Sequence, residues 1–177
     1  MRHRLCLLGD VEGDVVRLTP AGRMVEAWWH HLPHKFSHLC LDAFVVMPHH
    51  IHGIVGIMDT RPTTVSPPTT IPPTVGADPR VRPPSEPGAI PHQGAHVGAP
   101  LPTVVQWWKT MTTNAYIRGV RAAGWPPFDG QLWQRNYWER IIRTPRELDL
   151  TRRYIAGNPL RWHLDPMNPG RPQNQPE

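Results

Sequence analysis

The chain has 177 residues, enough for one domain with a substantial buried core. Its formal net charge of +5 and its pI near 9.9 favour an anionic partner, although a modestly basic protein need not bind nucleic acid. Its two cysteines, Cys6 and Cys40, are too few for a disulfide framework or a cysteine zinc site, and no apolar run is long enough to cross a bilayer. We therefore expect a cytoplasmic protein that does not enter a membrane.

The first predicted elements are a short extended run and a helix. Residues 15–18 form the extended run, and Thr19 and Pro20 then offer an N-cap and a first-turn proline to the helix, which Pro33 ends. Helical spacing favours packing on a sheet over base stacking for the tryptophans of this helix. Its apolar stripe consists of Met24, Val25, Trp28, Trp29 and Leu32.

Two apolar runs, residues 39–47 and 51–58, predict a hairpin joined at Pro48 and His49. The first run has apolar residues on both of its alternating faces, which is typical of a central strand. His50 and His52 project from the same face of the second run, so both imidazoles are placed to reach one divalent ion. The chain has 11 histidines, so a His-x-His triplet also arises by chance. The triplet alone does not decide between a metal site and a chance occurrence.

Composition changes abruptly over residues 59–100, which are dominated by Pro, Thr, Gly and Ala. Such a segment has too few large apolar residues to build a core, and it predicts a disordered insert. A proline-rich ligand for a partner domain is the functional alternative. We expect one domain over residues 1–164, interrupted by this insert, and a disordered tail over residues 165–177.

The second half of the chain predicts a helix over about 101–119, a strand over 133–143 and a final helix. Thr144 and Glu147 have the spacing of a capping box at the start of the final helix, which should stop before Pro159. The complete order of elements is typical of an α+β fold in which an antiparallel sheet carries helices on one face.

Four segments together resemble the REP-associated tyrosine transposases, which belong to the single-tyrosine HUH transposases. In that family, two histidines separated by a hydrophobic residue hold a metal ion. The resemblance covers residues 5–164 outside the insert, and one departure is His49, where the family usually carries asparagine. The segments are LDAFVVMPHHIHG (41–53), VQWWKT (105–110), LWQRNYWERIIR (132–143) and RYIAGNP (153–159).

The resemblance implies a ferredoxin-like antiparallel sheet with helices on one face, the HUH endonuclease fold. It implies a metal-dependent transposase and endonuclease that acts on single-stranded or hairpin DNA of repetitive palindromic elements, in the cytoplasm at the nucleoid. A 5′-phosphotyrosine intermediate would form on Tyr154. His50, His52 and Asn158 would hold Mg²⁺ or Mn²⁺.

The residues themselves are compatible with this chemistry. Tyr154 and Asn158 are four positions apart and share one face of the predicted helix, where an amide oxygen could join two imidazoles on an ion. Without the resemblance, Tyr154 reads as a half-buried aromatic of an amphipathic helix. Tyr137 is the second choice of nucleophile, although packing or DNA contact suits it better.

Two questions remain open at this point. A catalytically inactive relic that only binds DNA hairpins is the alternative function, and the sequence does not choose between a monomer and a homodimer.

Family members also have an apolar strand just before the segment that resembles residues 4–11. That central first strand is missing here, so we expect a mis-assigned start or a truncated product that folds poorly.

Overall fold

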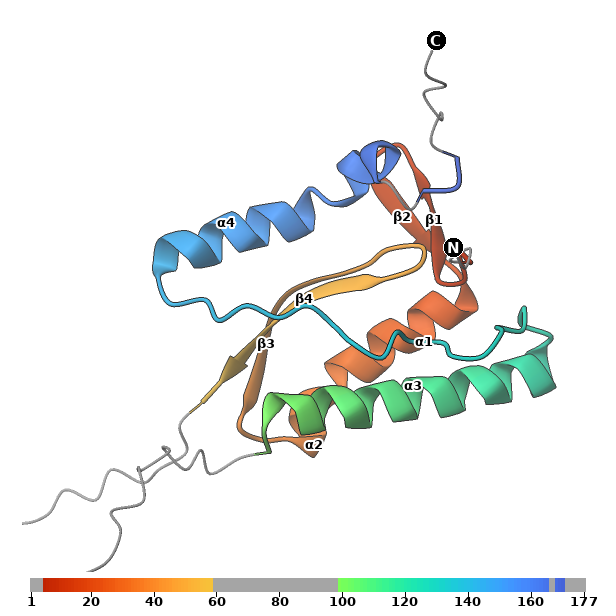
Figure 1. Cartoon of the computed structure of the whole chain (residues 1–177), viewed down its shortest axis with the longest axis horizontal. Helices are drawn as coiled ribbons and strands as arrows, with labels where there is room; N and C mark the ends of the chain where they lie inside the picture. The colour runs from red at the N-terminus through yellow and green to blue at the C-terminus, as the bar shows by residue number, and fades with distance from the viewer. Residues whose placement is uncertain (1–4, 59–98, 166–167, 171–177) are drawn as a thin grey trace, which may run out of the picture.

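The computed structural model describes residues 5–58, 99–165 and 168–170, and it confirms the α+β class (Figure 1). The insert that we predict over residues 59–100 lies outside the described residues, except for Ala99 and Pro100. The described elements, in chain order, are β1 (Gly9–Glu12), β2 (Val15–Leu18), α1 (Pro20–His30), α2 (Leu32–Lys35), β3 (Leu39–Val46), β4 (Ile51–Ile57), α3 (Leu101–Ala123), α4 (Pro145–Ala156) and the 3-10 helix η1 (Pro159–Leu164).

Helix α1 begins where the sequence predicts. The Thr19 hydroxyl oxygen accepts a hydrogen bond from the backbone N–H of Gly22 at 3.1 Å, and the same hydroxyl donates to the Leu7 carbonyl at 2.8 Å. This cap ties the start of α1 to the chain before β1. The predicted apolar stripe is buried at Val25 and Trp29. The helix ends at His30, and Pro33 lies in the first turn of α2 rather than at a helix end.

Strands β3 and β4 form the predicted hairpin, but its register contains a bulge. Leu41 pairs with Val55 and Phe44 pairs with Gly53, so two residues of β3, Asp42 and Ala43, lie opposite one residue of β4. The extra residue reverses the alternation of side chains along β3. As a result Phe44 faces α1, whereas Asp42 faces α4.

Helices cover both faces of this hairpin, whereas the order of elements predicted helices on one face only (Figure 1). On one face, the ring of Trp29 in α1 stacks on Phe44 with centroids 4.4 Å apart. On the opposite face, Arg152 of α4 forms an ion pair with Asp42. Helix α3 packs beside α1, and Val104, Trp108 and Tyr116 extend the buried core between them. The hairpin is therefore a middle layer.

The predicted strand over residues 133–143 is wrong, because this segment is not paired as a strand in the described structure. It runs back from α3 toward α4 (Figure 1), and contacts with α3 hold its first part. The Lys109 ammonium donates to the carbonyls of Gln134 at 2.7 Å and Arg135 at 3.2 Å, and the Trp133 indole N–H donates to the Thr112 hydroxyl at 2.8 Å. Aromatic and β-branched content favours an extended backbone, but only a partner strand makes it a sheet.

The described residues contain two separate two-stranded sheets, β1 with β2 and β3 with β4, and no single four-stranded sheet. Helix α4 begins at the predicted capping residue, since the Thr144 hydroxyl accepts from the Glu147 N–H at 3.1 Å. It ends at Ala156, just before the predicted stop. In the predicted tail, Asn168 donates its backbone N–H to the Asp165 carbonyl at 3.0 Å.

Candidate functional site

Three imidazoles meet at the turn between β3 and β4. His50 lies between the other two, because its Nδ1 is 2.9 Å from Nδ1 of His49 and its Nε2 is 3.0 Å from Nε2 of His52. The His50 and His52 rings are nearly perpendicular, with centroids 4.8 Å apart. The same-face placement predicted from the strand alternation therefore brings these two nitrogens together.

The spacing between His50 and His52 fits two ligands of one ion. Two nitrogens that are each about 2.1 Å from a metal lie roughly 3.0 Å apart at a right angle and roughly 3.4 Å apart in a tetrahedron. Burial lowers the pKa of His52, and the charge of Asp165 partly opposes this effect. A lowered pKa favours the neutral imidazole, which is the form that binds metals.

Helix α4 brings Tyr154 to this pair. The Tyr154 ring stands edge-on to the His52 ring with centroids 5.4 Å apart, and 46% of the residue is exposed. An ion pair with β3 fixes the helix, since Arg152 donates from Nε and Nη2 to the two carboxylate oxygens of Asp42 at 2.8 and 2.6 Å. The Arg152 hydrogen bond, followed by one from the Ala43 N–H, lowers the pKa of Asp42 to about 2.

Asn158 lies just after α4 and is only 9% exposed. Its amide nitrogen donates to the backbone carbonyl of Tyr154 at 3.5 Å, one helical turn earlier. This contact orients the amide group at the end of the helix that carries the tyrosine. The structure thus connects Asn158 to the backbone of Tyr154, and its role as a metal ligand stays a prediction.

The other two tyrosines lie elsewhere. Tyr116 is fully buried in the core, and its hydroxyl donates to the Pro126 carbonyl at 2.8 Å, which is a structural role. Tyr137 is partly exposed, and the Lys109 ammonium lies 5.3 Å from its ring centroid. Burial, followed by the hydrogen bond and charge of Glu139, raises the pKa of Tyr137. Of the three tyrosines, Tyr154 is the one in ring contact with a histidine of this site.

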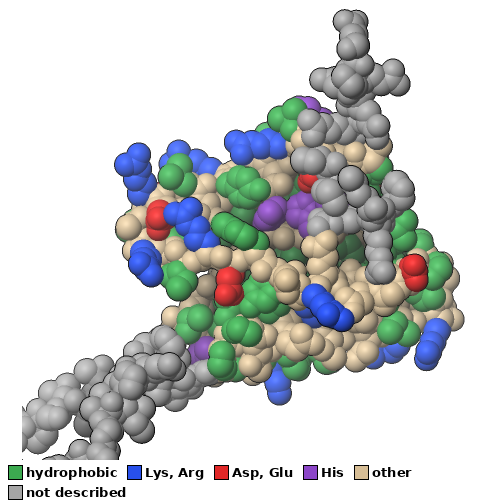
Figure 2. All heavy atoms as spheres, in the orientation of Figure 1, with side chains coloured by type: hydrophobic (Ala, Val, Ile, Leu, Met, Phe, Trp, Pro, Cys, Tyr) green, Lys and Arg blue, Asp and Glu red, His purple; other side chains and the backbone are tan. Residues whose placement is uncertain are grey.

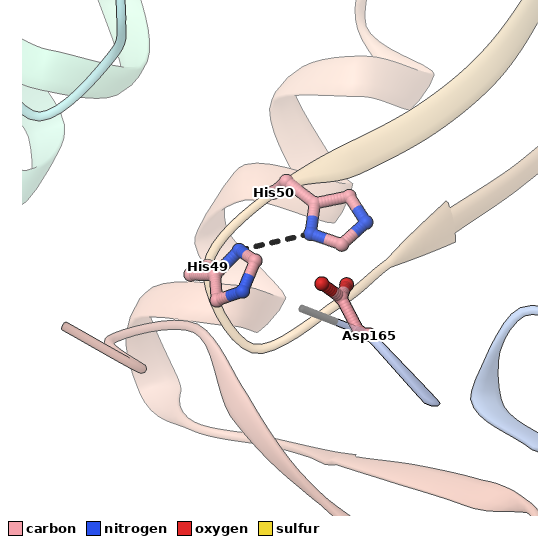
Figure 3. Close-up of side chains that lie close together, drawn as sticks. All are labelled: His49, His50 and Asp165. Atoms are coloured by element: carbon pink, nitrogen blue, oxygen red, sulfur yellow. Dashed lines mark hydrogen bonds between the residues drawn. The ribbon is translucent and has the colours of Figure 1, made fainter. Parts of the chain in front are cut away.

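Sequence reasoning missed Asp165 and gave His49 no role. Asp165 follows η1, and its carboxylate lies near the rings of His49 and His50, as Figure 3 shows. The possible ligand atoms of these three residues all lie within 4.8 Å of one another. The sequence held no signal for Asp165, because its position depends on how η1 folds back onto the hairpin turn.

Basic side chains lie on one side of this region. Figure 2 shows arginine side chains over α4, on the same face as the histidines. Trp138, on the segment that leads into α4, is 85% exposed, and an exposed indole suits base stacking on single-stranded nucleic acid. The exposed arginines of this region are Arg135, Arg140, Arg143, Arg146, Arg152, Arg153 and Arg161.

A Haemophilus influenzae protein described as uncharacterized is similar to this chain, with 26% identity over 164 residues. The aligned region covers 93% of this chain and 78% of that protein. No family model matches the chain, and no solved structure matches it significantly. Within the described residues, no helix has both the length and the apolar character needed to span a bilayer. The comparisons therefore assign no activity.

Proposed function

We propose that this chain is a metal-dependent DNA strand transferase and nuclease of the HUH type, which acts on single-stranded or hairpin DNA. The observation that carries the proposal is the contact between Tyr154 and His52, whose Nε2 lies 3.0 Å from that of His50. A nucleophilic hydroxyl and a pair of metal-binding imidazoles are the two components that phosphodiester cleavage through tyrosine requires. The sequence resemblance supports the same assignment.

The reaction exchanges one ester for another. The Tyr154 oxygen attacks the scissile phosphorus, a tyrosine–phosphate bond forms, and the bond from phosphorus to the 3′ oxygen breaks. One proton is lost from the phenol and one is gained by the 3′ oxygen, which leaves as a hydroxyl. The product is a 5′-phosphotyrosine that retains the ester bond energy, so strand transfer needs no nucleotide cofactor.

Mg²⁺ or Mn²⁺ is the ion that we propose for this site, held by His50, His52 and the amide oxygen of Asn158. The two imidazole nitrogens fit, because their 3.0 Å separation matches that of neighbouring ligands. When bound, the ion would neutralise charge that develops on the phosphate. The protein itself positions the phenol, through α4 and the ion pair of Arg152 with Asp42.

The charge and the exposed aromatic group support a DNA substrate. Arginines near α4 provide bidentate donors for phosphates, and exposed Trp138 provides a stacking surface. The competing function, a DNA-hairpin binder without catalysis, is favoured by one observation. In the part of the chain that the structure describes, β4 pairs with β3 alone, so the sheet behind the histidines has only two strands.

Covalent adduct formation tests the proposal. The full chain is incubated with Mn²⁺ or Mg²⁺ and a panel of DNA hairpins with single-stranded flanks, labelled at the 3′ end. We expect a labelled protein–DNA adduct on a denaturing gel. The same DNA labelled at the 5′ end should give a free, shortened strand with a 3′-hydroxyl.

Variants of the histidines identify the source of the activity. His50→Ala and His52→Ala should each remove the adduct, whereas His34→Ala, an exposed histidine of α2, should leave it unchanged. Tight binding of a hairpin without any adduct in either metal would contradict catalysis and support the binding function.

A further inference from the structure

The His49, His50 and Asp165 side chains form a second group of potential ligands beside the pair proposed for catalysis. Nδ1 of His49 and Nδ1 of His50 are 2.9 Å apart, and the three possible ligand atoms of the group lie within 4.8 Å of one another. Figure 3 shows the Asp165 carboxylate directed toward the two rings. This group involves the nitrogen of His50 that does not face His52.

The distance between the two Nδ1 atoms is close to the distance between two ligand atoms of one metal ion. Ligand atoms about 2.1 Å from one tetrahedral metal are roughly 3.4 Å apart. The two nitrogens would have to separate by a few tenths of an ångström, and the carboxylate would have to approach by a rotation of its side chain.

Local structure holds each member in position. The His49 ring packs against Trp162 of η1 with centroids 5.0 Å apart. The Asp165 N–H donates to the Trp162 carbonyl at 3.1 Å, and the Asn168 side chain donates to the same carbonyl at 3.1 Å. Trp162 therefore connects the element that presents Asp165 to the turn that presents His49.

We propose that His49, His50 and Asp165 form a binding site for a borderline transition-metal ion of the Zn²⁺ class. Two neutral imidazoles and one carboxylate are a donor set that zinc uses, with the fourth position left for water. The site goes beyond the proposed nuclease function, because it requires neither DNA nor Tyr154.

The geometry also indicates which ring nitrogen of each histidine binds the ion. An ion at this site takes Nδ1 of His49 and Nδ1 of His50, since these are the atoms that face each other. His50 then carries its proton on Nε2 and donates it to Nε2 of His52 at 3.0 Å. The ion is thus bound by two ring nitrogens, Nδ1 of His49 and Nδ1 of His50, that the nuclease site does not use.

Zn²⁺ binding to the untagged full chain, measured by titration calorimetry, tests the site without any DNA. We expect one Zn²⁺ per chain. His49→Phe keeps a ring against Trp162 but removes the nitrogen, and Asp165→Asn keeps the shape but removes the charge. Each should weaken Zn²⁺ binding by more than roughly tenfold.

The control variants are matched in kind. Asp149→Asn removes a carboxylate of α4, and His34→Ala removes one member of the stacked His31 and His34 pair. We expect each to change the affinity by less than about twofold. Long-range proton–nitrogen NMR should show Zn²⁺ on Nδ1 of His49 and His50.

Three results would overturn the inference: wild-type chain that binds no Zn²⁺, an unchanged affinity in both His49→Phe and Asp165→Asn, or coordination of His50 through Nε2. In the last case the ion would lie between His50 and His52. Failure of the nuclease proposal would leave these binding results unaffected.

Discussion

The Tyr154 ring stands edge-on to the His52 imidazole, with centroids 5.4 Å apart, across the interface between α4 and β4. Tyr154→Phe should therefore abolish the covalent adduct while hairpin affinity changes by less than about twofold, because only one hydroxyl is lost. Gel-shift binding and denaturing gels measure the two quantities on the same DNA. Tyr137→Phe is the matched control and should retain the adduct. An adduct that persists in Tyr154→Phe and disappears in Tyr137→Phe would assign the nucleophile to Tyr137.

Asp42 and Arg152 predict a pH dependence of stability. Hydrogen bonds from Arg152 and from the Ala43 N–H hold the pKa of Asp42 at about 2, below its ordinary value of 3.8. The folded state thus binds this proton less readily than the unfolded state, and the ionised carboxylate stabilises the fold above about pH 4. This contribution is lost as the pH falls toward 2.

Because the ion pair is partly exposed, Asp42→Asn should lower the melting temperature by only about 1–3 °C at pH 7. The decrease should be smaller at pH 2, where the Asp42 carboxylate of the wild type is itself partly protonated. Asp149→Asn removes a carboxylate 3.4 Å from the same arginine and should have the smaller effect. Thermal melts from pH 7 to pH 2 make the comparison. An Asp42→Asn melting temperature equal to that of wild type at every pH would show that the ion pair does not fix α4.

Gly53 provides a test of the packing beneath the histidines. A Cβ at this position would lie 2.5 Å from Trp29 ring atoms and 3.0 Å from a Phe44 ring atom. Gly53→Ala should therefore lower the free energy of unfolding by about 1–3 kcal/mol. Trp29→Phe makes room, so the double variant should lose less than the sum of the two single variants in denaturant titrations. Strict additivity would show that the methyl group does not meet the indole.

Local signals predicted several features of this fold. Thr19 and Thr144 cap helices as their sequence contexts indicate, because capping depends on residues three positions apart. The hairpin and the same-face placement of His50 and His52 follow from the two-residue period of a strand. These features need only the nearest neighbours in the chain.

Other features depend on contacts that the sequence does not display. The ion pair of Asp42 with Arg152 joins residues 110 positions apart, and it helps place Tyr154 beside His52. The bulge at Asp42 and Ala43 lacks a glycine or other local marker, yet it decides which face Asp42 occupies. The segment 133–143 has strand propensity without a paired strand in the described structure, so propensity alone gave the wrong element.

Zn²⁺ should inhibit the Mn²⁺-dependent nuclease, a prediction that rests on both proposed sites. An ion on Nδ1 of His50 places the ring proton on Nε2, which is 3.0 Å from Nε2 of His52. That proton takes the lone pair of His50 Nε2 and is hydrogen-bonded to His52 Nε2, so His50 can no longer hold the catalytic ion and the two sites exclude each other. Adduct yield at fixed Mn²⁺ should fall as Zn²⁺ is added. In Asp165→Asn the half-inhibitory Zn²⁺ concentration should rise by at least about tenfold, whereas in Asp149→Asn it should stay at the wild-type value. Equal inhibition of wild type and Asp165→Asn would mean that Zn²⁺ acts at the catalytic pair itself, and uninhibited wild type would mean that the two ions do not compete for His50.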